Sequence, residues 1–96
     1  MRTIRQSGQF KRDLKHESKG PNRAILAEEF VGIVGALAKD QPLAEKNRDH
    51  ALTGDWKDHR DCHIKPDLIL IYRKHEQDDI KTLELVRLGS HSKLGL

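Results

Sequence analysis

The sequence predicts an α+β fold, in which a short N-terminal strand and a helical hairpin pack on one face of a mainly antiparallel sheet of four to five strands. Helical periodicity dominates the first half, where apolar residues recur with the spacing of a helix face between residues 22 and 39. The second half contains three apolar or alternating segments between residues 56 and 88, as strands do. This segregation of helices and strands along the chain is typical of α+β domains.

Capping and turn signals define the first elements. Residues Thr3–Ser7 (TIRQS) alternate in polarity and are expected to form a short strand. Ser7 is a suitable N-cap for a helix that extends through Lys19. The pair Gly20-Pro21 then ends this helix and leads tightly into the next one. Two helices joined in this way are expected to form an antiparallel hairpin.

The second helix is expected from about Asn22 to Lys39. Its apolar stripe consists of residues spaced by three or four positions, namely Leu26, Phe30, Ile33 and Leu37. The segment from Asp40 to Gly54 has no sustained period and predicts an extended loop. A loop of this length is more often functional than idle.

Strand signals fill the rest of the chain. The most apolar run, LILIYR at Leu68–Arg73, is expected to be the central strand of the sheet. Alternating segments before and after it predict two further strands, and HEQDD is expected to be a polar hairpin connection. The tail GSHSKLGL would add a short edge segment. The expected flanking strands are Trp56–Ile64 and Ile80–Leu88.

Bulk composition limits the classes of protein. The 96 residues suffice for one domain, expected to span residues 1–96. A net charge of +3 favours an anionic partner, although it serves solubility equally well. The single cysteine, Cys62, excludes an internal disulfide and suits a reducing compartment. No apolar run of membrane-spanning length and no signal peptide are evident, so a cytoplasmic protein without membrane partners is expected.

The stretch DHALTGDWKDHRDCHIKPD, residues 49–67, concentrates the reactive side chains. If residues 56–64 form one strand, alternation places Lys57, His59, Asp61 and His63 on one face. The other face would then carry Trp56, Asp58, Arg60, Cys62 and Ile64. Since Cys62 and Ile64 are plausible core residues, the histidine face would be the open one. His50 precedes this strand, and Asp67 follows it.

Four interpretations of this stretch compete. His and Asp are good ligands for zinc or iron, but no established metal-ligand spacing is present, so no metal and no cofactor are expected. A Cys nucleophile is disfavoured because Cys62 points away from the histidines. General acid–base catalysis fits better, since one His can accept a proton while another donates one. The remaining alternative is a polar surface loop without chemistry.

A resemblance narrows these alternatives. The pattern D-H-x-L-x-G-x-W, then R-D-x-H-x-x-P-D and the apolar strand I-L-I-Y, resembles the central signature of the YafQ branch of the RelE/ParE toxin superfamily. LVRLGSHSKL resembles the ending of that family, and SGQFKRDLK resembles its opening. The likeness covers nearly the whole chain in the correct order. It implies a RelE-like fold and a toxin of a type II toxin–antitoxin pair.

The resemblance also implies a specific activity. The chain would be a ribosome-dependent endoribonuclease (an mRNA interferase) that cleaves mRNA through attack by the 2′-hydroxyl. Its partners would be a cognate antitoxin, the ribosome and the mRNA substrate. Positions matching the family's active site are His50, His63, Asp67 and His91, and further polar positions that would contact the phosphate are Asp61 and Arg87. His91 would donate the proton to the leaving 5′-oxygen, while the base remains open among the first three.

The chain departs from the family pattern at its C-terminus. It ends in SKLGL, without the aromatic residue available in the family for stacking on a base. Two alternatives with the same fold therefore stay open: a ParE-like, non-enzymatic inhibitor of DNA gyrase, and an inactive toxin-like binding module. Four acid–base residues favour the ribonuclease, because a gyrase inhibitor has no use for them.

Overall fold

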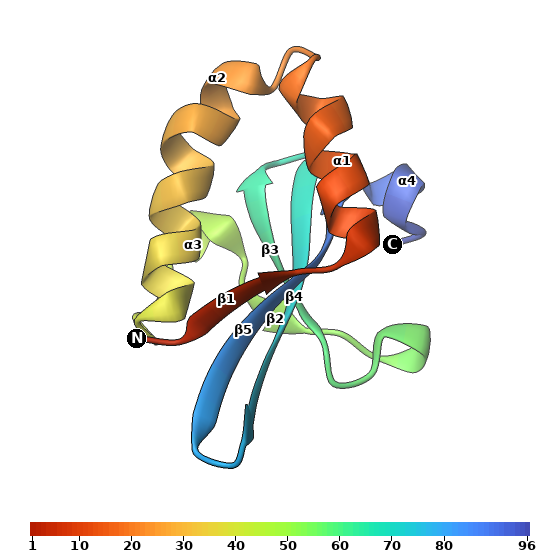
Figure 1. The fold of residues 1–96 in the computed structure, drawn as a ribbon. Helices are drawn as coiled ribbons and strands as arrows, with labels where there is room; N and C mark the ends of the chain where they lie inside the picture. The colour runs from red at the N-terminus through yellow and green to blue at the C-terminus, as the bar shows by residue number, and fades with distance from the viewer.

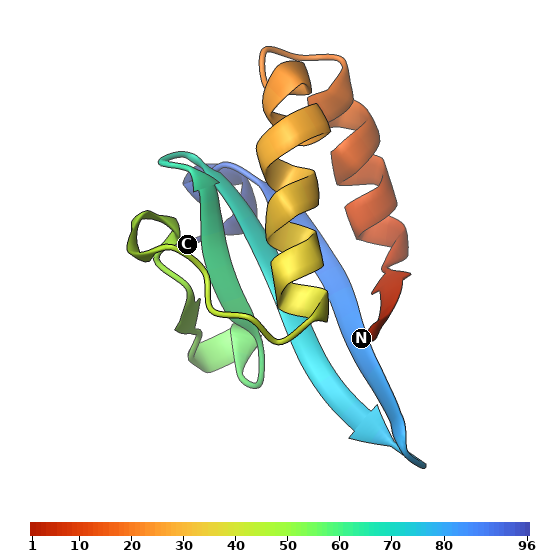
Figure 2. The ribbon, with the colours of Figure 1, turned by 90° about the vertical axis from the view of Figure 1, so that its left-hand side faces the viewer.

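The computed structural model describes residues 1–96 and contains one five-stranded mixed sheet with helices packed on it. Figure 1 shows the helical hairpin standing over the sheet, and Figure 2 shows the two helices side by side from the edge. The elements in chain order are β1 (Thr3–Gln6), α1 (Gly8–Ser18), α2 (Arg23–Ile25), a π-helical turn (Leu26–Phe30), α3 (Val31–Ala38), a 3-10 turn (Glu45–Asn47), β2 (His50–Ala51), a 3-10 turn (Gly54–Trp56), β3 (Arg60–Lys65), β4 (Leu68–Gln77), β5 (Ile80–Gly89) and α4 (His91–Leu94).

The sheet has the strand order β1-β5-β4-β3-β2. All pairs are antiparallel except β1 and β5, which are parallel. The N-terminal strand therefore lies beside the last one, because the helical hairpin carries the chain away from the sheet before it returns. The predicted α+β class and the number of strands are confirmed.

Capping explains how the chain enters α1. Ser7 is the N-cap, as predicted, and its Oγ accepts a hydrogen bond from the Phe10 amide at 2.9 Å. The same hydroxyl donates to the carbonyl of Val86 at 2.7 Å, which ties the helix start to β5. Phe10 is fully buried and stacks on Phe30, with the ring centroids 6.1 Å apart. The hairpin therefore closes on an aromatic contact that joins its two helices.

The second helical segment buries the predicted stripe. Leu26, Phe30, Ile33 and Leu37 are all buried against the sheet. The segment is not a uniform α-helix, because one π-helical turn spans Leu26–Phe30. Such turns are rare and insert one extra residue into the helix. No helix of the structure is both long enough and apolar enough to cross a membrane.

The pleat of β3 and β4 separates the two faces of the sheet. Cys62 and Ile64 join Leu70 and Tyr72 in the core beneath the helices. Ile69 and Ile71 project to the opposite face, where they pack with Leu94 of α4. The predicted burial of Cys62 and Ile64 is confirmed, and the face that was expected to be open carries a small apolar cluster in addition to its polar residues.

The expected strand over residues 56–64 is wrong in its first half. β3 begins only at Arg60, and Asp58 has φ +69°, a left-handed conformation that interrupts a strand. Lys57 and His59 therefore do not alternate with Asp61. Trp56 lies in the 3-10 turn and packs against the cluster of Ile69 and Leu94, not on the Cys62 face as expected.

Two boundaries near the C-terminus also differ from expectation. The segment HEQ belongs to β4, and only Asp78 and Asp79 form the turn, with φ +52° and +67°. Asp adopts positive φ more readily than most residues, so the pair permits a tight hairpin. The tail forms the short helix α4, capped by Ser90, and not an edge strand.

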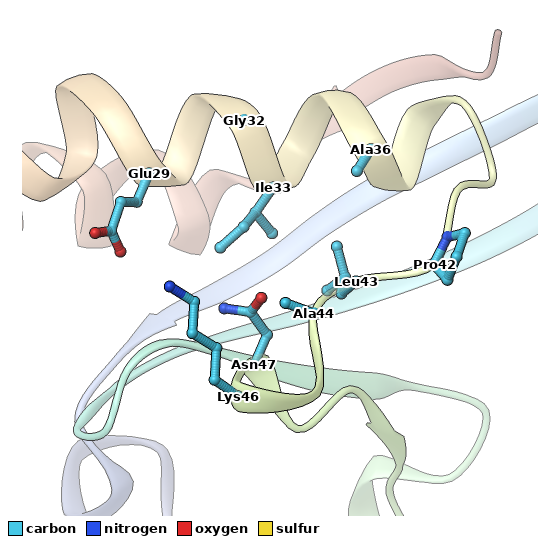
Figure 3. Close-up of a pocket in the computed structure, with 9 residues that line it drawn as sticks. All are labelled: Glu29, Gly32, Ile33, Ala36, Pro42, Leu43, Ala44, Lys46 and Asn47. Carbon is cyan, nitrogen blue, oxygen red and sulfur yellow. The ribbon is translucent and has the colours of Figure 1, made fainter.

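The expected extended loop, residues 40–54, contains two short elements and folds back on α3. Between loop and helix lies a cavity of about 340 Å³, lined by residues including Ile33, Ala36 and Leu43 (Figure 3). Asn47 is buried, and its Nδ2 donates to the carbonyl of His63 at 2.8 Å. This bond fixes the loop against β3.

The core makes a direct prediction about stability. Leu70 is fully buried in the main cluster, whereas Ile80 is 59% exposed near the β4–β5 turn. Leu70→Ala is expected to lower the free energy of unfolding by about 2–5 kcal/mol, because it removes apolar contacts and leaves a cavity. Ile80→Ala is the matched control and should change it by less than about 0.5 kcal/mol. Urea denaturation monitored by Trp56 fluorescence measures both, and equal effects would contradict this description of the core.

Candidate active site

Three histidines from separate elements meet on the face of the sheet away from the helical hairpin. His63 belongs to β3, His50 to β2 and His91 to α4. The ring centroids of His63 and His91 are 5.2 Å apart, and those of His50 and His63 are 6.5 Å apart. His63 is therefore the central member, and residues 41 positions apart along the chain (His50 and His91) flank it.

Asp61 lies beneath His50 as its direct partner in the β2–β3 register. Its side chain is buried, and Oδ1 lies 3.1 Å from Nδ1 of His50. The angles are not those of a hydrogen bond, and Oδ1 has no other hydrogen-bond partner. Burial raises the pKa of Asp61, while the charges of His50 and His63 oppose this. Asp61 is therefore a buried carboxyl group in contact with the Nδ1 side of His50.

The ring of His50 has a defined orientation. Its Nδ1 lies 2.7 Å from the carbonyl oxygen of Arg48. A carbonyl can only accept, so Nδ1 carries the hydrogen in this contact. In the neutral ring, Nε2 then keeps its lone pair and is free to accept a proton.

Asp67 and His91 form the second oriented pair. Oδ1 of Asp67 accepts hydrogen bonds from the backbone N of His91 at 3.1 Å and from its Nδ1 at 2.9 Å. The backbone hydrogen bond first, and then the bond from the ring, lowers the pKa of Asp67. The aspartate is therefore ionised at neutral pH, and its hydrogen bond with Nδ1 orients the ring of His91.

His63 differs from the flanking histidines. Burial lowers its pKa, and the attraction of Asp61 opposes this while the charges of His91 and Arg48 lower the pKa further. His63 is accordingly neutral at pH 7. The three imidazoles thus have three different electrostatic environments.

Arg87 lies outside this group. Its Nε donates to Oδ2 of Asp13 at 2.8 Å, and its Nη2 donates to Oδ1 of the same residue at 3.4 Å. Asp13, on α1, is only 1% exposed, and it also accepts from the backbone amide of Leu88 and lies 3.4 Å from Nζ of Lys93. Arg87 is not among the residues that line the cavity beside His63 and His91. Its contact with the phosphate remains a prediction, and the ion pair with Asp13 argues against it.

A second network fixes the approach to His50. The hydroxyl of Tyr72, which is 1% exposed, donates to Asp49 Oδ1, and Nε of Arg60 lies 3.2 Å from the same oxygen. Asp49 is thereby tied to β4 and β3 directly before His50. Sequence inspection missed this role, because a Tyr in an apolar strand looks like an ordinary core residue.

Two other polar residues of the opening stretch are excluded from the cluster. His59 packs edge-on against Trp56, with 5.4 Å between the ring centroids, and its Nδ1 contacts the carbonyl of Lys57. Cys62 is fully buried, and burial together with Asp49 and Asp61 raises the pKa of its thiol to about 12. Such a thiol is not a nucleophile at neutral pH.

The sequence also failed to identify two basic residues of the site. A cavity of about 420 Å³ is lined by Lys46, Arg48, His63, Pro66 and His91. Their only signal in the sequence was positive charge just before His50.

No three His, Cys, Asp or Glu side chains are arranged so that they could hold one metal ion.

Known proteins share this fold. A toxin from Helicobacter pylori, crystallised with bound metal, is 47% identical, with a TM-score of 0.82 over 98% of this chain and 99% of that one. YafQ in the E. coli DinJ–YafQ toxin–antitoxin complex is 35% identical, with a TM-score of 0.77 over 97% and 96% of the two chains. The mRNA interferase toxin YafQ of Escherichia coli K12 is 33% identical over 97% of this chain and 95% of its own length.

The fold and these relatives therefore define a bacterial toxin of the type found in toxin–antitoxin pairs. Residues 2–95 match the family described as bacterial toxin of type II toxin–antitoxin system, YafQ. The chain belongs to this family, and the resemblance drawn from the sequence is confirmed.

The ion pair of Asp13 predicts an acid-sensitive contribution to stability. Burial raises the pKa of Asp13, but hydrogen bonds from Arg87 and from the Leu88 amide outweigh burial and lower the pKa from 3.8 to about 2. At pH values above the pKa of the unfolded state, the ionised Asp13 stabilises the fold by about 2 kcal/mol, because its pKa is lower in the folded state. This stabilisation is lost as the pH falls through the folded-state pKa of about 2. When the pH is lowered from 6 to 2, the free energy of unfolding should decrease by about 2 kcal/mol more in the wild type than in Asp13→Asn. Equal losses in both proteins would contradict the assignment.

Proposed function

We propose that this toxin is an mRNA interferase that cleaves mRNA on the translating ribosome, with residues 1–96 acting as one domain. One observation carries the proposal: His50 and His91 flank His63 and have different hydrogen-bond partners, and His63 and His91 line a cavity. Cleavage of RNA needs a base near the 2′-hydroxyl, an acid near the 5′-oxygen and positive charge around the phosphate. The name of the E. coli relative as an mRNA interferase supports the same activity.

His50 is the residue that we assign as the general base. Its Nδ1–H is held by the carbonyl of Arg48, which leaves Nε2 to accept the proton of the 2′-hydroxyl. The imidazolium that forms lies next to the buried carboxylate of Asp61, which stabilises it. The 2′-oxygen then attacks the adjacent phosphorus atom, and a new P–O bond forms.

His91 is assigned as the general acid. Asp67 holds its Nδ1–H, so a protonated ring presents Nε2–H to the leaving 5′-oxygen. The P–O5′ bond breaks as this proton is transferred, which gives a 2′,3′-cyclic phosphate and a 5′-hydroxyl. His63, neutral and central, is placed to hydrogen-bond to the phosphate between the two.

The ribosome and an antitoxin are the proposed macromolecular partners. A domain with few aromatic residues grips RNA weakly, so the ribosome would supply much of the positioning. Basic side chains on α1, at its C-cap and on α2 are suited to rRNA phosphates, namely Lys11, Arg12, Lys15, Lys19 and Arg23. Because the E. coli relative forms a complex with DinJ, a cognate antitoxin is proposed to bind this chain and block cleavage.

The missing C-terminal aromatic residue has a structural counterpart. Leu94 is 5% exposed and packs on Ile69 and Ile71, where it anchors α4 and thereby His91. The end of the chain therefore serves to position the acid, and base stacking is not part of the proposed mechanism.

The decisive test replaces the proposed acid. His91→Ala is expected to reduce cleavage of mRNA on programmed ribosomes by about 10²–10⁴-fold, because no group then protonates the 5′-oxygen. Mapping of the 5′ ends on the mRNA measures this, and analysis of the 3′ ends should show a 2′,3′-cyclic phosphate. His59→Ala is the matched control, since His59 lies outside the cluster, and it should cleave like the wild type.

Three outcomes would overturn parts of the proposal. Equal cleavage by His91→Ala and the wild type would remove His91 as the acid. Inhibition of gyrase without cleavage by the wild type would favour the ParE-like alternative. Absence of both activities would favour an inactive binding module.

The mechanism predicts independence from transition metals. Although a relative was crystallised with bound metal, this chain places no three suitable donors together, so no step is assigned to a metal. Cleavage is expected to be unchanged by a chelator selective for transition metals, with magnesium held constant for the ribosomes. Activity lost with the chelator and restored by zinc would contradict this.

A further inference from the structure

Two cations beside the histidine cluster have no acidic partner. The ion pairs of the structure involve Arg2, Arg60, Arg73, Arg87, Lys74 and Lys93, and none of them involves Lys46 or Arg48. Arg60 and Arg87, which are the other arginines near the site, are paired with Asp49 and Asp13. The permanent positive charge at the cavity is therefore that of Lys46 and Arg48.

The backbone holds Arg48 in a fixed place relative to the catalytic groups. Arg48 has φ +47° and ψ +46°, a left-handed conformation that is uncommon for Arg. Its N–H donates to the carbonyl of Glu45 at 3.1 Å, and its own carbonyl orients His50. The preceding residue, Asn47, is bonded to the carbonyl of His63.

The cavity beside Arg48 is suited to an anion. It is lined by Lys46, Arg48, His63, Pro66 and His91, and no carboxylate is among them. An Arg offers several donors in a planar fork that matches a phosphate. Arg48 and the proposed acid, His91, line the same cavity, where a substrate phosphate would approach.

Lys46 connects this cavity to its neighbours. It also lines the groove against α3 and a third cavity that contains Lys65 and His63. Figure 3 shows its side chain extending from the loop toward α3, on the side of Glu29, although no ion pair forms there. Because its side chain is flexible, the ammonium group can reach each of these three cavities.

We propose that Arg48, together with Lys46, binds backbone phosphates of the single-stranded RNA next to the one that is cleaved. This assignment rests on the proposed ribonuclease activity and adds substrate-binding residues to it. RNA is favoured over an acidic protein segment because the same cavity borders His63 and His91, whose chemistry requires a phosphate there.

The test separates the charge of Arg48 from its backbone conformation. Asn adopts left-handed φ more readily than Arg, so Arg48→Asn removes the charge while its carbonyl can still orient His50. Lys46→Gln removes the second charge with little change in shape. The double variant Lys46→Gln/Arg48→Asn is compared with Arg5→Gln/Lys81→Gln, which removes two exposed charges without an ion pair, far from the cavity along the sheet.

Binding is measured without cleavage. A short single-stranded DNA carries the phosphates but lacks the 2′-hydroxyl, and its dissociation constant follows from NMR titration of labelled protein between about 50 and 200 mM salt. Removal of two phosphate contacts should lower the slope of log K against log salt by about 1.4, since each contributes about 0.7 on a single strand. The wild type should show its largest shifts at residues 46–48, 63 and 91. The control variant should keep the wild-type slope.

Cleavage on ribosomes gives the second readout. The double variant should raise KM at least tenfold and lower kcat much less, because the acid and the base are intact. The single variant Arg48→Lys keeps the charge and loses the planar fork, so its KM should lie between those of the wild type and the double variant. Equal slopes and equal KM for the double and control variants would overturn the assignment, as would weakened binding of a Glu-rich peptide with unchanged binding of the oligonucleotide. A wild type that binds the oligonucleotide through residues 46–48 but cleaves nothing would instead refute the proposed function.

Discussion

The register of β3 against β4 is the constraint on which the site depends. Cys62 pairs with Leu70, and both point into the core beneath the helices, so Asp61 and His63 must face the other way. A slip of one residue would bury the two polar side chains and expose the apolar ones. The burial of the core residues therefore fixes the face of the sheet on which His63 lies, and no additional interaction is needed for this.

Buried polar contacts then join the peripheral elements to this strand pair. Asp13 links α1 to the end of β5, and from there to α4 through Lys93. On the other side, Asp49 receives a hydrogen bond from Tyr72, and Asn47 donates one to β3. Buried carboxylates and amides without partners are costly, so these networks leave the loop and the C-terminal helix little freedom. The two flanking histidines are held by them, each from a different part of the chain.

The same side chain takes different roles according to its neighbours. His50 has a carbonyl and a buried carboxylate at Nδ1, His91 has an exposed carboxylate, and His63 has mainly burial and positive charge. In the proposed mechanism, these surroundings suit the three rings to the roles of proton acceptor, proton donor and neutral hydrogen-bonding group, respectively. In the same proposal, Arg48, which has no ion pair, adds a cation to the cavity that His63 and His91 line.

The sequence by itself determined the helical hairpin, the α+β class and the burial of Cys62, because apolar periodicity and capping are local properties. It also indicated His50, His63, Asp67 and His91, through the resemblance to the toxin family. Only the tertiary structure decided the start of β3, where Asp58 takes a left-handed conformation, and the helix at the C-terminus. It alone paired Arg87 with Asp13 and left Arg48 free. Such pairings join residues far apart along the chain, so no local pattern can reveal them.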